Sequence, residues 1–277
     1  MRCAWKELLS ILPMTLRQPV DEHGRECLQE LRLRLHAPAQ LILGKGKREL
    51  SVVTTAADLN FVVNAASRYS PWTAASAAKG YITAPGGHRI GLAGEVICRE
   101  GVITGIKNLT SLCIRIARDF PGIAAGIPKT AGNLLILGAP GTGKTTLLRD
   151  LIRQISVSEC VAVVDERGEL FPPGAMYQYG RQTDILTGCD KERGIDMALR
   201  TLGPAWIAMD EITSQSDCRA LVQACWSGVK LVATAHAAGV QDLLYRPVYK
   251  PLVDTRLFET VIVLHGDKSW KAERMKL

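Results

Sequence analysis

The stretch GAPGTGKTT, residues 138–146, decides the fold of the second half of this 277-residue chain. It fits the pattern G-x-x-x-x-G-K-[ST], with Gly138, Gly143, Lys144 and Thr145 at the fixed positions. The apolar run NLLILG precedes it, and the run KTTLLRDLIRQIS, apolar at helical spacing, follows it. A strand, a glycine-rich turn and a helix in this order predict a loop whose amides bind the phosphates of a nucleotide.

The residues of this loop have separate expected roles. The glycines at 138, 141 and 143 let the backbone approach phosphate oxygens with no side chain in the way. We expect Lys144 to bridge the β- and γ-phosphates of ATP, and the Thr145 hydroxyl to ligate Mg²⁺. The expected cofactor-binding set is the whole loop: Gly138, Ala139, Pro140, Gly141, Thr142, Gly143, Lys144, Thr145 and Thr146.

After the loop, short apolar runs alternate with helical runs. CVAVVDE, WIAMDE, KLVATAH and ETVIVLHG are apolar throughout, whereas KERGIDMALRTL and DCRALVQACW have helical spacing. Strands without polar alternation, separated by helices, predict a mostly parallel sheet with both faces covered. We therefore expect an α/β domain over residues 133–277.

The first half follows a different pattern. ELRLRLHAPAQLIL alternates apolar and basic residues as a half-exposed strand does, and LNFVVNAASRYS is helical in character. GYITAPGGHRIGLAGEVI places a Gly-Gly turn between two strand-like runs, which predicts a hairpin. We expect a smaller α+β domain over residues 1–120 and a linker over the Pro-, Gly- and Ala-rich residues 121–132.

Two of the apolar runs end in pairs of acids. A phosphate loop with magnesium needs a carboxylate at the end of a neighbouring strand, and Asp210 is the expected metal ligand. Glu211 could then polarise the attacking water, but Glu166, at the end of CVAVVDE, is a second candidate for this catalytic base. The residues leave the choice open, and an acid after a strand can also merely cap a helix.

A histidine ends a third apolar run. His236 closes KLVATAH, and Thr234 stands two positions before it. Residues two apart in a strand share a face, so we expect both side chains to face the site and His236 to sense the γ-phosphate.

Composition excludes several classes of protein. Apolar residues make up 47 % and charged residues 22 %, which is ordinary for a globular protein, and the longest apolar runs are too short to cross a bilayer. The eight cysteines form no CxxC pair and no zinc-ligand spacing, so we expect buried, reduced thiols. The net charge of +7 by itself identifies no partner.

With these motifs in order, the chain resembles the secretion-type ATPases of the RecA-like class. The matching boxes are GAPGTGKT, the acidic box VVDERGE, WIAMDE and the histidine box GVKLVATAH. Within this class it resembles the stage III sporulation AA family of endospore-forming bacteria, through ELRLRLHAP, YITAPGGHRIGLAGE, NLTSLCIRIARD, TTLLRDLIR and VVDERGEL. These segments span nearly the whole chain.

The resemblance implies an ATP-hydrolysing enzyme that forms homo-oligomeric, hexameric rings. It implies that Glu166 is the favoured base and that Arg200 corresponds to an arginine preceding the WIAMDE strand. Arg89, Arg115 and Arg118 are candidates for arginines that reach the phosphates from the N-terminal domain. The implied place is the cytoplasmic side of the mother-cell membrane, peripheral to it, with membrane proteins of a sporulation channel as partners.

Two other functions stay open at this stage. A nucleic-acid-binding ATPase would fit the positive charge, but only 5 % of residues are aromatic, too few for a base-stacking platform, and we expect no appended binding module. A regulatory protein that binds a nucleotide without hydrolysing it would carry the same loop.

Overall fold

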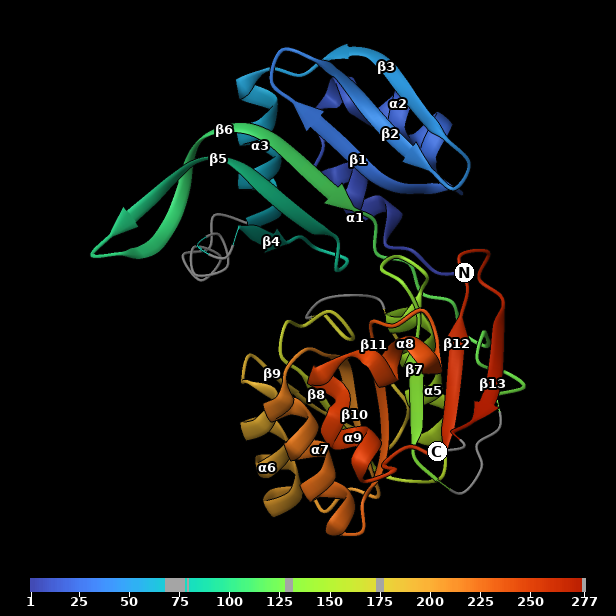
Figure 1. Cartoon of the computed structure of the whole chain (residues 1–277). Coiled ribbons are helices and arrows are strands. Elements are labelled where there is room, and N and C mark those ends of the chain that lie inside the picture. Colours follow the sequence, from blue (N-terminus) through green and yellow to red (C-terminus); the bar gives the residue numbers. More distant parts are fainter. Residues whose placement is uncertain (68–77, 79, 128–131, 173–176, 276–277) are drawn as a thin grey trace. The chain divides into compact units, whose positions relative to one another are not determined.

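The computed structural model describes residues 1–67, 78, 80–127, 132–172 and 177–275. Its described residues form two compact units (Figure 1). Met1–Asp119 forms the body of the first, and Phe120–Phe171 with Tyr177–Leu277 forms the second. Part of the stretch expected to be a linker, residues 128–131, lies outside the described residues.

The first unit is built on a six-stranded sheet in which every neighbouring pair is antiparallel. The strand order is β3-β2-β1-β6-β5-β4. The strands are β1 Leu28–Arg34, β2 Pro38–Leu43, β3 Lys47–Val53, β4 Tyr81–Thr83, β5 Arg89–Arg99 and β6 Val102–Arg115. The Gly-Gly turn predicted from the sequence lies between β4 and β5, which pair as a hairpin.

Three helices pack into one apolar core with this sheet: α1 Trp5–Ser10, α2 Met14–Gly24 and α3 Ala56–Ser67. Their position follows from the alternation in β1, where Leu31 and Leu33 are buried and Arg34 is exposed. The predicted α+β character of this half is therefore confirmed.

The second unit contains a seven-stranded sheet with the order β13-β12-β7-β11-β10-β8-β9. Its strands are β7 Leu134–Leu137, β8 Val161–Asp165, β9 Thr183–Thr187, β10 Trp206–Ile212, β11 Lys230–Ala235, β12 Thr260–Leu264 and β13 Trp270–Arg274. All neighbours are parallel except β12 and β13. The sequence predicted the five apolar strands and missed β9 and β13, which are short and only partly buried.

Helices cover both faces of this sheet, which is why its central strands are apolar throughout. Helix α5, Lys144–Ile155, packs on one face, and helices α6, Lys191–Thr201, and α7, Gln215–Trp226, pack on the other. Two shorter helices, α8 Val240–Tyr245 and α9 Lys250–Asp254, complete the second layer. Among the described residues, no helix is both long and apolar enough to cross a bilayer.

The start of the second unit is bound firmly to α5. The carboxylate of Asp150 accepts the backbone N–H groups of Gly122 and Ala124, at 2.9 and 2.8 Å. One residue before this unit, Asp119 exchanges both backbone hydrogen bonds with Arg2, at 2.8 and 2.9 Å. Two residues of the expected linker, Gly122 and Ala124, are therefore hydrogen-bonded to helix α5.

The cysteines correct one expectation. All eight are unpaired, as expected, but Cys27, Cys98 and Cys160 are exposed and only Cys218 is fully buried. The apolar run after Cys160 was misleading because the buried strand β8 begins only at the next residue, Val161.

His88 is a buried hydrogen-bonding residue of the first unit. Its Nδ1 accepts the N–H of Ala117 at 3.1 Å, so Nε2 carries the proton and donates to the carbonyl of Ala4 at 2.9 Å. Burial lowers the pKa of His88, and the bond to Ala4 opposes this only in part. The neutral imidazole thus joins three distant segments of the chain.

We predict that the first unit loses stability as the pH falls below about 6.5, the ordinary histidine pKa. Since the folded pKa is depressed, the unfolded chain takes up the proton first, and its uptake favours unfolding down to the folded pKa. His88→Gln, which cannot titrate, is expected to flatten the decline in unfolding midpoint between pH 7.5 and 5.5. His23→Gln, at a half-exposed position, is the control; equal slopes for wild type and His88→Gln would contradict the prediction.

Candidate functional site

The carboxyl ends of four parallel strands meet at one edge of the second unit's sheet. β7, β11, β10 and β8 are successive neighbours in the strand order. The loop 138–143 follows β7, His236 follows β11, and the two acid pairs end β10 and β8. The glycine loop, the two acid pairs and the histidine therefore lie at one edge, where open α/β sheets bind ligands.

The glycines of the loop meet separate steric needs. Gly141 and Gly143 have φ values of +76° and +104°, which side-chain-bearing residues rarely adopt. Gly138 has no room for a side chain, because a Cβ there would lie 2.7 Å from Thr142 Oγ1 and 2.8 Å from the Leu264 carbonyl. Ala139 and Pro140, at the outer turn of the loop, are exposed.

Helix α5 begins directly after the loop with unpaired polar groups. Its N-cap, Gly143, offers no side-chain acceptor, and the first turn holds no acid. The first amides of the helix, together with the helix dipole, are therefore available to an anion. Thr145 and Thr146 occupy this turn and are partly exposed.

Lys144 is the buried cation of the loop, with 6 % of its surface exposed. Its ammonium donates to the carbonyls of Gly138, at 2.8 Å, and Ala139, at 3.0 Å. Burial lowers the pKa of Lys144, whereas the nearby carboxylates of Asp210 and Glu211 raise it. The ammonium is thus held inside the curve of the loop, where an anion would meet it.

Asp210 receives hydroxyl donors from both sides. Thr145 Oγ1 donates to its Oδ2 at 2.7 Å, and Thr234 Oγ1 donates to its Oδ1 at 2.5 Å. The Thr234 hydroxyl in turn accepts the backbone N–H of Glu211 at 2.8 Å. The Thr145 hydroxyl and the Asp210 carboxylate are hard oxygen ligands, so this pair fits a magnesium ion.

Glu211 lies at a break in the strand. The pairing of β10 with β11 shifts register between Met209 and Ile212, and Glu211 has a φ of +56°. This left-handed conformation is costly for a residue with a side chain. It turns the Glu211 side chain to the same edge of the sheet as His236.

A hydrogen bond and an ion-pair contact, both through His236, connect the loop lysine to Glu211. Lys144 Nζ lies 3.0 Å from His236 Nδ1, and His236 Nε2 lies 3.2 Å from Glu211 Oε1. Because an ammonium can only donate, Nδ1 is the acceptor and the ring proton stands on Nε2, facing the carboxylate. The structure places Thr234 and His236 together at the site, as the two-residue spacing predicted.

The acids at the end of β8 divide their work. Asp165 is buried, and its carboxylate accepts the backbone N–H groups of Glu169, Leu170 and Phe171 at 2.8, 2.9 and 3.0 Å. Burial raises the pKa of Asp165, while the bonds from Phe171 and Leu170 lower it. Asp165 therefore shapes the turn, and Glu166 remains the solvent-facing acid of the pair.

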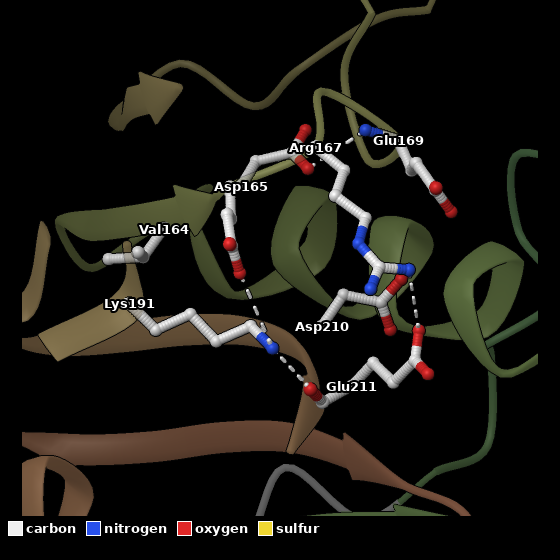
Figure 2. A pocket seen from close by; sticks show the side chains of 8 residues that line it. Val164, Asp165, Arg167, Glu169, Lys191, Asp210 and Glu211 are labelled. Carbon is white, nitrogen blue, oxygen red and sulfur yellow. Dashed lines mark hydrogen bonds and ion pairs between the residues drawn. The ribbon is translucent and has the colours of Figure 1, made fainter. Parts of the chain in front are cut away.

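Figure 2 shows the pocket that these acids line. Glu166 exposes 42 % of its side chain and forms an ion pair with Lys191 at 3.8 Å. Arg167 Nη1 lies 3.7 Å from Glu211 Oε2. The two acids proposed from the sequence as catalytic bases thus share one pocket, and each faces a cation.

Two cations on helices at this site were not predicted from the sequence, and neither was Arg167 in the turn after β8. Arg149 of α5 donates to the carbonyls of Leu170, at 2.5 Å, and Glu169, at 3.0 Å, and so fastens the turn after β8 to the loop helix. Lys191 opens α6 and is 7 % exposed. The sequence signal for Arg149 and Lys191 is a charged residue on the apolar side of a helix. From one sequence alone, such a residue is hard to distinguish from a charge on the exposed side.

Arg200 lies outside this cluster. It is near the C-terminal end of α6, whereas Lys191 at the start of that helix faces the acids. The Arg200 side chain is 76 % exposed and forms an ion pair with Asp196 at 2.8 Å. The structure of one chain therefore does not bring Arg200 to the loop.

The three arginines of the first unit differ in how they are held. Arg118 donates to the carbonyls of Leu28, Gly24 and Arg25. Arg115 is exposed and lies 3.7 Å from Glu30. The guanidinium of Arg89 stacks 4.0 Å above the Tyr81 ring.

Comparison with known proteins gives the context of this site. The family model described as "Sporulation stage III, protein AA" matches residues 4–273. The stage III sporulation protein AA of Bacillus subtilis (strain 168) is 35 % identical over 282 residues, which cover 95 % of this chain and 91 % of that protein.

Solved structures resemble the chain at low sequence identity. The Legionella pneumophila ATPase DotB matches with a TM-score of 0.61 and 16 % identity over 94 % of this chain and 79 % of that one. The pilus retraction motor PilT with bound ADP matches with a TM-score of 0.60 and 14 % identity over 90 % and 76 %. These likenesses confirm the predicted fold class, a RecA-like α/β core after a smaller α+β domain.

We predict that Thr234→Val lowers the free energy of unfolding by about 1–3 kcal/mol, because it leaves the Glu211 N–H without its acceptor and Asp210 with one donor fewer. Thr234→Ser keeps the hydroxyl and is expected to lose less. Urea unfolding of the three proteins measures the difference. If the valine variant is as stable as wild type, this hydroxyl does not hold the strand end.

Proposed function

Because this chain belongs to the sporulation stage III protein AA family and carries a full phosphate loop, we propose that it is an ATPase of the secretion-motor type. The observation that supports this most is the meeting of Lys144, Thr145 and Asp210 at the mouth of the loop. A buried lysine, a threonine hydroxyl and a strand-end carboxylate are the parts that a P-loop ATPase uses.

Nucleotide binding falls to the loop and the first turn of α5. The amides of residues 138–146 would surround the phosphates, and Lys144 would exchange its carbonyl partners for phosphate oxygens. The Thr145 hydroxyl and Asp210 would hold Mg²⁺, which neutralises phosphate charge.

We assign the base to Glu166. The Glu211 carboxylate faces the His236 Nε2–H at 3.2 Å and Arg167 at 3.7 Å, whereas the Glu166 carboxylate faces solvent and one ammonium at 3.8 Å. A carboxylate beside solvent, whose neighbouring ammonium lies beyond hydrogen-bond distance, can accept the proton of an attacking water. Glu211 then holds His236, whose opposite nitrogen faces Lys144, so that the histidine responds to charge at the loop.

The oligomer and its setting belong to the same proposal. We propose a homo-oligomeric, hexameric ring, in which the exposed Arg200 and Arg115 are available to a neighbouring subunit. Arg118 donates to three backbone carbonyls and is assigned to the fold. The ring would work at the cytoplasmic face of the mother-cell membrane, peripheral to it, and drive a channel of membrane proteins during sporulation by coupling hydrolysis to motion of the two units.

Lys144→Ala is expected to lower the rate of ATP hydrolysis by roughly 100-fold or more, since it deletes the cation that would contact the phosphates. Phosphate release and binding of a fluorescent ATP analogue with Mg²⁺ measure the loss. Lys271→Ala, at an exposed lysine of β13, is the matched control and should behave as wild type. A wild-type protein that neither binds nor hydrolyses ATP would overturn the proposed function.

Glu166→Gln is expected to spare nucleotide binding and to reduce turnover to a low residual rate, because an amide cannot accept the proton. Single-turnover hydrolysis separates the two steps, with Glu192→Gln at an exposed position of α6 as control. Normal turnover by Glu166→Gln beside an inactive Glu211→Gln would move the base to Glu211.

A further inference from the structure

Lys191 stands where a cation is unfavourable on two counts. It is the first residue of α6, and the positive end of a helix dipole disfavours a positive charge. It is also 7 % exposed, so its ammonium has lost most of its water. A position that breaks two local rules needs a compensating gain, and such positions concentrate at functional sites.

The compensation comes from four oxygens on four separate segments. Lys191 Nζ donates to the backbone carbonyl of Glu211 at 2.5 Å, and it lies 3.4 Å from Thr213 Oγ1 and 3.5 Å from Asp217 Oδ2. These groups belong to the end of β10, the turn after it and the start of α7. The fourth oxygen, Glu166 Oε2 at 3.8 Å, belongs to the turn after β8.

These contacts act differently on the two acids. The short bond to the Glu211 carbonyl fixes the peptide group at the left-handed residue of β10. The longer contact to Glu166 attracts that carboxylate without locking it, since 3.8 Å is beyond hydrogen-bond distance. Figure 2 shows the Lys191 ammonium lying beside Glu211 and reaching the side chains that line the pocket.

The pocket is lined by more acids than bases, so the positive charge of Lys191 matters for its electrostatics. Its lining includes the carboxylates of five acids, Asp165, Glu166, Glu169, Asp210 and Glu211, against the cations Arg167 and Lys191. Arg167 is 55 % exposed, so water screens its charge, while the Lys191 side chain is 7 % exposed and acts at closer to full strength. Without that charge, like-charge repulsion would push Glu166 toward solvent.

We propose that Lys191 is a positioning residue of ATP hydrolysis: its ammonium holds the Glu166 carboxylate over the pocket and fixes the backbone at Glu211. This inference rests on the proposed function. Lys191 does not touch the nucleotide in this assignment and acts through Glu166, so its loss should affect the chemical step more than binding.

The test compares Lys191→Met with Arg193→Met, which removes a positive charge from the same helical turn at an 84 % exposed side chain. For Lys191→Met we expect kcat to fall at least tenfold while KM for ATP and affinity for a fluorescent ATP analogue stay within about threefold of wild type. Arg193→Met should match wild type. The fold is expected to survive for two reasons. The apolar methionine fills most of the space of the lysine side chain, and the Asp217 carboxylate still accepts the backbone N–H groups of Thr213 and Ser214.

A double-mutant cycle then shows whether Lys191 acts through Glu166. In a Glu166→Gln background, Lys191→Met should lower residual single-turnover hydrolysis by less than twofold, because the carboxylate it positions is gone. Full additivity of the two losses would overturn the assignment, as would a Lys191→Met protein with wild-type kcat.

Two further measurements, the thermal stability of Lys191→Met and the activity of the wild type, separate the remaining outcomes. If Lys191→Met unfolds at a markedly lower temperature or loses kcat and affinity together, Lys191→Arg is measured in its place. An arginine variant that keeps its kcat supports the positioning role, because it keeps the charge. An arginine variant that is folded but has lost kcat opposes that role. An inactive wild type overturns the proposed function itself, and this inference with it.

Discussion

The carboxylate of Asp210 is the point on which the whole site depends. One of its oxygens accepts a hydroxyl from the loop helix through Thr145, and the other accepts a hydroxyl from β11 through Thr234. These two bonds set the distance between the glycine loop and the central strands. Because Thr234 also receives the Glu211 amide, the same contact fixes where the neighbouring acid turns out of the strand.

Around this contact several residues adopt conformations or positions that are unfavourable in free energy when taken alone. Glu211 adopts a left-handed backbone, Lys191 buries a cation at the wrong end of a helix, and Lys144 is dehydrated inside the loop. Each group is stabilised by a group of opposite charge or by main-chain carbonyls at the same edge of the sheet. Strain and buried charge gathered in one place, within a sheet that is otherwise apolar, are typical of a site kept for chemistry.

The sequence was informative wherever a feature is local. Apolar runs predicted the central strands, the glycine spacing predicted the loop, and the two-residue spacing of Thr234 and His236 placed them on one face. It failed where a role depends on distant segments. Asp165 and Glu166 are adjacent and chemically alike, and only the turn at residues 169–171 makes one structural and leaves the other exposed. Lys191 is 25 residues from Glu166, and nothing near it in the chain indicates its burial.

The anchoring of residues 119–124 has a mechanical meaning. Asp119 is fixed by Arg2, and Gly122 is fixed by Asp150 on the helix that starts at the phosphate loop, so only Phe120 and Pro121 lie between the anchors. Two residues, of which Pro121 has a φ fixed by its ring, leave the backbone between the anchors little conformational freedom. Little free main chain therefore lies between the last anchored residue of the first unit and the segment bound to helix α5. For the motor proposed above, a few glycines inserted between Asp119 and Gly122 would lengthen this connection and weaken the coupling of hydrolysis to motion of the units.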